Sequence, residues 1–129
     1  MNEEQGLINI SSGLLAALSK GELNINVFKQ DILVLQCIVA GTSHQTLDNV
    51  EPNLRGAAKL EVVREGKNEF DPFAVALHFH GVKVGYVPRE KNEVIARLLD
   101  AGKSFFAIIQ ASAREGKWLK LEVKVFIQD

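Results

Sequence analysis

Residues 64 to 89 read REGKNEFDPFAVALHFHGVKVGYVPR, and this stretch decides the fold. From Phe73 to Phe79, large apolar residues alternate with smaller or polar ones, which is the period of a half-buried β-strand. His80-Gly81 is a two-residue connection of the kind that joins antiparallel strands. Val82 to Val87 forms the returning strand, and Pro88 ends it. The stretch therefore predicts a β-hairpin that follows a polar loop.

Four further segments have the composition of strands. Residues 32–40 (ILVLQCIVA) are nearly all apolar and rich in β-branched residues, which predicts a central strand. Residues 57–64 lead into the hairpin, and residues 104–114 and 119–125 form a second hairpin around Glu115-Gly116-Lys117. Short antiparallel connections and the need to cover strand edges favour a mainly β fold, a small six-stranded, mostly antiparallel β-barrel.

The pattern changes to the helical period of 3.6 residues after Pro88. Pro88 suits a first helical turn and Gly102 suits a stop, so we expect a helix over Arg89–Ala101, packed across one opening of the barrel. Its apolar face comprises Val94, Ile95, Leu98, Leu99 and Ala101.

Residues 1–30 form an extension before the main domain, which we assign to residues 31–129. Ser11-Ser12 can cap a short helix that carries Leu14, Leu15 and Leu18. A helix of about ten residues is not stable alone, so these leucines need a partner surface. We expect that surface to come from a second copy of the chain, in a homodimer.

Composition limits the class of protein. The chain has 129 residues, 47% of them hydrophobic and 24% charged, which is ordinary for a soluble globular protein of one domain. Its start is acidic and lacks the basic region of a signal peptide, and Cys37 has no partner for a disulfide. These features predict a cytoplasmic protein. The net charge of −1 argues against a bulk electrostatic nucleic-acid binder and leaves room for a local basic patch.

No pattern of catalytic residues is present. His78 and His80 have a spacing that metal sites use, but only His44 and Cys37 remain as further ligands outside the acids. The serines lie in no nucleophile motif, and no glycine-rich phosphate loop occurs. We therefore expect a protein that is not an enzyme and has no metal or cofactor.

Polar and aromatic side chains gather where the loop meets the end of the first hairpin. Asn68 and Asp71 each suit a turn, with Asp71 accepting hydrogen bonds from amides of its own loop. Phe70, between two acidic residues, is placed to stack on a base. Tyr86 can present its ring or its hydroxyl, and Arg89 can pair with a phosphate or solvate the start of the helix.

The order of these residues resembles the HIRAN domain, a module found alone in bacteria and at the N-terminus of some helicase-like DNA repair proteins. The resemblance covers roughly residues 33–126. It is carried by Asn68, Phe70-Asp71, Ala74-Val75, Gly85-Tyr86-Val87-Pro88 and the helix end Leu98-Leu99-Asp100-Ala101-Gly102. It implies an OB-like barrel that binds single-stranded DNA at free 3′-hydroxyl ends. It also implies that Asp71 accepts a hydrogen bond from that terminal hydroxyl.

The chain departs from the family pattern at three places. Ser43-His44 stands where some members have a basic-aromatic pair, so His44 is a sixth candidate contact to nucleic acid. Glu69 replaces a usual proline and Phe73 a usual asparagine, and Glu69 adds repulsion toward phosphate.

The alternative to a DNA-binding domain is a protein-interaction or dimerisation module without nucleic-acid affinity. If the domain binds DNA, we expect its partner to be a helicase or nuclease.

Overall fold

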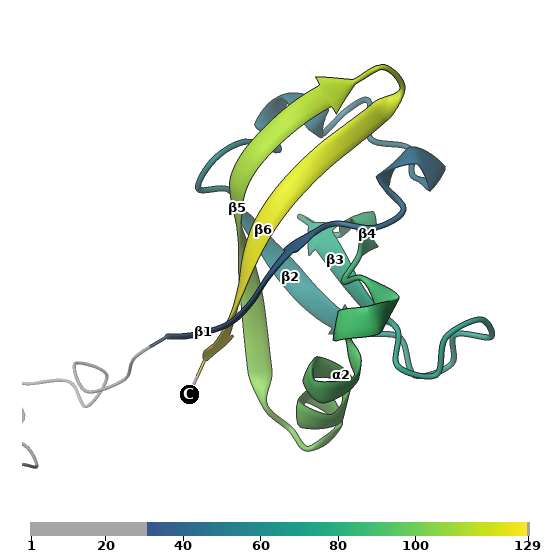
Figure 1. Ribbon diagram of the computed structural model, residues 1–129, viewed down its shortest axis with the longest axis vertical. Helices are drawn as coiled ribbons and strands as arrows, with labels where there is room; N and C mark the ends of the chain where they lie inside the picture. The colour runs from purple at the N-terminus through teal and green to yellow at the C-terminus, as the bar shows by residue number, and fades with distance from the viewer. Residues whose placement is uncertain (1–30, 129) are drawn as a thin grey trace, which may run out of the picture. The chain divides into compact units, whose positions relative to one another are not determined.

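The computed structural model describes residues 31–128 (Figure 1), so the expected leucine-bearing helix and its dimer contact lie outside the described residues. The six strands are β1 (Ile32–Ile38), β2 (Lys59–Arg64), β3 (Val75–Phe79), β4 (Val82–Tyr86), β5 (Ser104–Glu115) and β6 (Trp118–Gln128). They form one antiparallel sheet in the order β1-β6-β5-β2-β3-β4. The α-helix is α2 (Glu93–Asp100), and short 3₁₀ turns are η2 (Thr42–His44), η3 (Glu51–Asn53) and η4 (Arg89–Lys91).

The mainly β, six-stranded antiparallel fold is confirmed, but the sheet is not closed into a barrel. Its two edge strands, β1 and β4, are brought together at one point just after β1. There Ala40 and Tyr86 exchange two backbone hydrogen bonds of 2.8 Å. The sheet is therefore strongly curled, and the Ala40–Tyr86 bridge links its first and last strands.

Both predicted hairpins are present. His80 and Gly81 join β3 to β4 with φ angles of 48° and 83°, as a two-residue turn between right-twisted strands requires. The β5–β6 hairpin is the longest element pair, and Figure 1 shows its turn at the opposite end of the sheet from α2. Strand β5 pairs with β2 on one side and with β6 on the other. It therefore connects the β5–β6 hairpin, through β2, to the β3–β4 hairpin.

The prediction that residues 32–40 form a central strand is wrong. The strand β1 lies at an edge, pairs only with β6 along its length, and exposes 55% of Ile32 and 43% of Leu33. An apolar run predicts burial from its own composition, whereas the number of neighbouring strands depends on long-range pairing. The sheet order therefore leaves an apolar edge in contact with solvent.

Strand β3 is more deeply buried than its alternating sequence pattern predicted. The strand β3 begins at Val75, after a turn at Pro72-Phe73, and Val75, Ala76 and Leu77 are all fully buried. Small alanines occupy the alternate positions because both faces of β3 are covered. A half-buried strand was therefore the wrong expectation for its first three residues.

The predicted helix is divided into two parts. Arg89–Lys91 is a 3₁₀ turn, and the α-helix begins only at Glu93. The helix contacts β2 and β5 and buries Ile95 and Ala96, whereas Val94, which we expected on the apolar face, is 68% exposed. Within residues 31–128, no helix is long and apolar enough to cross a membrane.

The core lies inside the curl of the sheet. It is built from inward-facing side chains of every strand, and its fully buried large members include Leu54, Leu60, Leu77, Ile109, Leu121, Val39, Val75, Val84 and Val125. This core supports the loop of residues 65–74, which projects between the ends of β2 and β3 (Figure 1).

Arg64 fastens that loop to the rest of the fold, so we expect Arg64→Met to be destabilising. Its Nε lies 3.0 Å from Asp100 Oδ1, and its guanidinium also donates to the carbonyl oxygens of Ala74 (3.1 Å) and Pro72 (2.8 Å). Hydrogen bonds of a charged donor contribute about 1.5–3 kcal/mol, so we expect a loss in that range in the free energy of unfolding by urea.

The matched control is Arg55→Met, which removes the same charge from an exposed position. Its effect should stay within about 0.5 kcal/mol. Equal losses in the two variants would show that Arg64 does not fasten the loop.

Candidate nucleic-acid interface

The loop of residues 65–74 is held in a tight turn by Asn68. Its Oδ1 accepts hydrogen bonds from the backbone N–H groups of Phe70 (2.8 Å) and Asp71 (2.9 Å), and its Nδ2 donates to Glu65 Oε1 at 3.0 Å. An asparagine that satisfies successive amides folds the chain back on itself. The result is that Phe70 projects outward with 83% of its surface exposed.

Asp71 is half-buried and fixed at both carboxylate oxygens. Oδ1 accepts from the backbone N–H of Phe73 at 2.9 Å, and Oδ2 accepts from Asn92 Nδ2 at 2.8 Å. Arg89 Nε lies 3.8 Å from the same Oδ2, and the Arg89 guanidinium donates to the carbonyl of Phe70. The carboxylate therefore has a set orientation, with an arginine beside it.

Tyr86 ends β4 and forms the floor of the same region. Its hydroxyl donates to Glu65 Oε1 at 2.8 Å and accepts from Lys83 Nζ at 2.8 Å. The hydroxyl is thus engaged within the protein, Lys83 Nζ lies 4.9 Å from the centroid of the ring, and Tyr86 lines the pocket described next.

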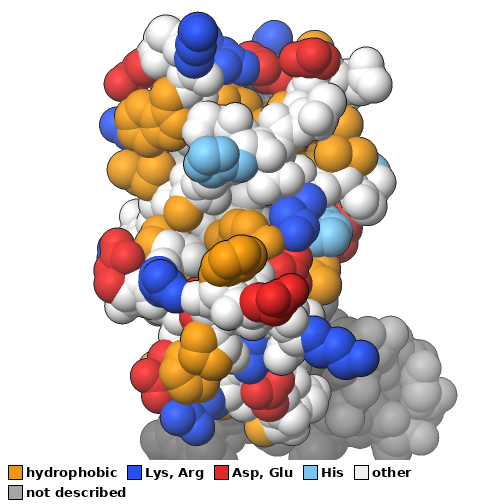
Figure 2. Space-filling view, turned by 90° about the vertical axis from the view of Figure 1, so that its right-hand side faces the viewer, with side chains coloured by type: hydrophobic (Ala, Val, Ile, Leu, Met, Phe, Trp, Pro, Cys, Tyr) orange, Lys and Arg blue, Asp and Glu red, His pale blue; other side chains and the backbone are white. Residues whose placement is uncertain are grey.

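A pocket of about 240 Å³ is lined by five of the six predicted site residues, together with Ala74: Asn68, Phe70, Asp71, Tyr86 and Arg89. His44, the sixth, is exposed on η2 and does not line this pocket, although η2 contacts β4. Figure 2 shows acidic, basic and hydrophobic side chains interleaved on one face of the domain rather than a continuous basic surface. Recognition at such a face depends on individual contacts more than on a field of one sign.

Three residues that support this pocket were missed by sequence reasoning. Asn92 is only 2% exposed and, although it occupies the N-cap of α2, makes no capping hydrogen bond with its side chain because its amide points to Asp71. Glu65 and Lys83 were assigned only to a polar loop and a strand. The N-cap position could have been identified from Asn92 preceding the helical pattern. Its contact with Asp71 depends on the tertiary fold.

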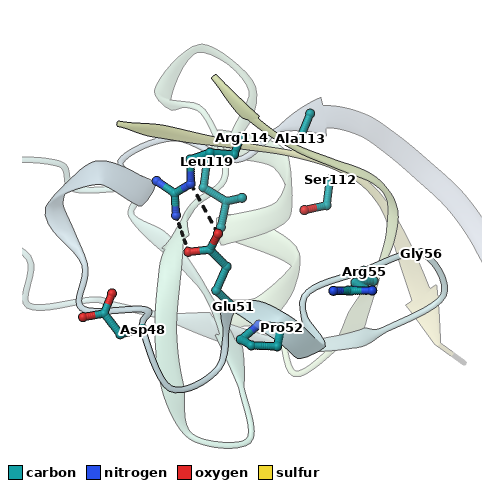
Figure 3. Close-up of a pocket in the computed structure, with 9 residues that line it drawn as sticks. All are labelled: Asp48, Glu51, Pro52, Arg55, Gly56, Ser112, Ala113, Arg114 and Leu119. Atoms are coloured by element: carbon teal, nitrogen blue, oxygen red, sulfur yellow. Dashed lines mark hydrogen bonds and ion pairs between the residues drawn. The ribbon is translucent and has the colours of Figure 1, made fainter. Parts of the chain in front are cut away.

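A larger hollow of about 610 Å³ lies elsewhere, between η3 and the β5–β6 hairpin. Figure 3 shows Arg114 turned toward Glu51, with which it forms an ion pair, while Asp48 and Arg55 lie at opposite sides. It is open and contains none of the predicted site residues. The larger of these two hollows is therefore not the one that the predicted site residues line.

The domain is a curled antiparallel sheet whose smaller pocket places an exposed aromatic ring beside a fixed carboxylate and an arginine. Within residues 31–128, no group of three or more His, Cys, Asp or Glu side chains is arranged to hold a metal. The chain belongs to the HIRAN domain family, whose model matches residues 32–128. HIRAN domains are binding modules, and the family is associated with DNA binding.

Two solved structures share the fold. A protein from Lactobacillus plantarum has a TM-score of 0.71 at 20% identity, covering 78% of this chain and 98% of that one. The HIRAN domain of human HLTF has a TM-score of 0.58 at 15% identity, covering 77% of this chain and 80% of that one. No curated protein matches the sequence.

Proposed function

We propose that this domain is a non-enzymatic module that binds single-stranded DNA and recognises a free 3′-hydroxyl end. The observation that carries the proposal is the pocket that combines the 83% exposed ring of Phe70 with Asp71 and Arg89. A terminal nucleotide offers a base to stack, a hydroxyl to donate and a preceding phosphate to neutralise. Each of these groups has a complementary side chain in the pocket.

Asp71 is the residue that would select the end. A carboxylate among internal nucleotides repels the backbone, but a terminal 3′-hydroxyl has no phosphate on that side and donates a hydrogen bond. The two oxygens of Asp71 each accept one hydrogen bond within the protein, at 2.9 Å and 2.8 Å. A carboxylate has about four acceptor positions, so capacity for a hydroxyl remains.

Arg89 would hold the phosphate that precedes the terminal nucleotide. Its side chain is 68% exposed, and its contacts with Asp71 Oδ2 and the Phe70 carbonyl leave other N–H groups free. Those two contacts also keep the guanidinium next to the carboxylate, where hydroxyl and phosphate of one nucleotide would lie. His44, exposed on η2, is the candidate contact for a nucleotide farther along the strand.

Salt dependence of oligonucleotide binding tests this function. A single strand bound through phosphates should lose affinity with a slope of about −0.7 in log K against log salt for each phosphate neutralised. We expect Arg89→Met to reduce the slope by about one such unit. Arg55→Met, which changes an exposed arginine of the larger hollow, should leave it unchanged. Absence of binding even at low salt would contradict the function.

The second candidate, a protein-interaction module, is favoured by a different observation. Edge strand β1 exposes Ile32, Leu33, Val34 and Ile38, and exposed apolar edges promote pairing with another chain. On this alternative a second copy of the chain covers β1. A monomer mass by light scattering at high concentration, together with salt-sensitive DNA binding, would decide for the first candidate. A dimer that binds no oligonucleotide would decide for the second.

Under the first candidate, a helicase or nuclease in DNA repair that acts on the same end is the fitting partner.

A further inference from the structure

A compact polar cluster lies next to the pocket and joins three parts of the fold. Glu65 follows β2, Asn68 lies in the loop, and Lys83 and Tyr86 belong to β4. Lys83 Nζ is 2.6 Å from Glu65 Oε2 and 2.8 Å from the Tyr86 hydroxyl, and it lies 4.9 Å from the centroid of the Tyr86 ring. The charged groups are only partly exposed, 23% for Glu65 and 31% for Lys83.

A single oxygen of Glu65 connects loop and strand. Oε1 accepts the Tyr86 hydroxyl at 2.8 Å and Asn68 Nδ2 at 3.0 Å. Asn68 in turn holds the backbone N–H groups of Phe70 and Asp71. The orientation of the two side chains that would meet the terminal nucleotide therefore depends, through Asn68, on where the Glu65 carboxylate lies.

We propose that Glu65 and Lys83 are positioning residues for the end-recognition pocket, in which Glu65 aligns Tyr86 with the Asn68 turn and Lys83 neutralises Glu65. This inference rests on the function proposed above. Lys83 is adjacent to the pocket, yet its ammonium is used by Glu65 and Tyr86 rather than offered to a phosphate. Its neutralising role matters because an unpaired carboxylate here would repel the backbone of an incoming strand.

The alignment of Tyr86 with the Asn68 turn should therefore depend on pH. Burial alone would raise the pKa of Glu65, but hydrogen bonds from Lys83, Asn68 and Tyr86 and the charge of Lys83 outweigh burial and lower it. The alignment is therefore present at neutral pH and is lost only as pH falls through this lowered pKa. Arg64 and Lys67 are the other charged groups that line the hollow beside Glu65; Arg64 is paired with Asp100, and Lys67 is exposed. Without Lys83, the pH at which this alignment is lost should be higher.

Ring NMR signals of Tyr86 test this directly, because the chain contains a single tyrosine. In the unmodified protein we expect the ring signals to change in one acid transition. Lys83→Met should raise the midpoint by about one pH unit, and Glu65→Gln should abolish the transition. Ring signals that titrate alike in all three proteins would overturn the inference.

Oligonucleotide binding is the second test of this inference. Glu65→Ala should weaken binding of a strand ending in 3′-hydroxyl about tenfold, which corresponds to about 1.4 kcal/mol. Glu51→Ala, which removes the Arg114-paired carboxylate of the larger hollow, should leave it within about twofold. Unchanged binding in Glu65→Ala would overturn the positioning role. If the unmodified protein binds no strand, the proposed function fails, and the ring signals still decide whether Glu65 and Lys83 align Tyr86.

Discussion

Replacing Gly85 by Ala should destabilise the domain by about 3 kcal/mol or more, because no space exists for a methyl group. A Cβ at Gly85 would lie 2.5 Å from the Ala40 carbonyl oxygen and 2.5 Å from Val39 Cγ1. Ala40 forms the bridge to Tyr86 that joins the two edges of the sheet, so relief of the clash requires backbone movement there. The measurement is the free energy of unfolding from urea denaturation followed by circular dichroism.

Gly66→Ala is the matched control for this variant. No atom lies within 4 Å of a Cβ built at Gly66, so the same methyl group meets only solvent. We expect its effect to stay within about 0.5 kcal/mol. Equal stability of the two variants would contradict the close approach between β4 and the segment after β1.

Asp71→Ala should remove most of the preference for a 3′-hydroxyl over a 3′-phosphate end. A half-buried, charge-assisted hydrogen bond contributes roughly 1–3 kcal/mol, and under the proposed function Asp71 would also repel a terminal phosphate. The quantity to measure is the ratio of the two affinities in the same protein. Any unfolded fraction lowers both affinities equally and cancels from this ratio.

Glu69→Ala provides the control for charge. It removes an acid two residues away that is exposed and does not line the pocket. It should strengthen binding of both ends alike and leave their ratio unchanged, because its repulsion toward phosphate is not directed at the end. If Asp71→Ala and Glu69→Ala behave alike, Asp71 acts only through its charge.

Much of the fold could be predicted because it is encoded locally. Alternating residues on either side of His80-Gly81 specify a hairpin, and the Pro88–Gly102 spacing specifies a helical segment. The edge position of β1 could not be predicted, since its composition is that of a buried strand and its one partner, β6, is separated from it by a long stretch of chain. Burial of both faces of β3 was missed for a different reason: its neighbours β2 and β4 are close in sequence, but the packing that covers its faces depends on the tertiary fold.

The candidate site shows a similar division. Residues 68–71 are close in sequence, and the hairpin returns Tyr86 and Arg89 to them, so their meeting in one pocket follows from the predicted topology. The buried amide of Asn92 and the ion pair of Glu65 with Lys83 join residues about 20 positions apart through side-chain contacts. Such contacts depend on packing, and the residue types alone gave no sign of them. His44 stays a prediction, on a turn outside the pocket.

The most direct measurement compares two short single-stranded DNA oligonucleotides of one sequence, one ending in 3′-hydroxyl and one in 3′-phosphate, against the unmodified protein at a single low salt concentration. Because Asp71 would accept a hydrogen bond from the first end and repel the second, we expect the hydroxyl-ended strand to bind at least about tenfold more tightly. Equal binding of the two strands would contradict end recognition by this domain.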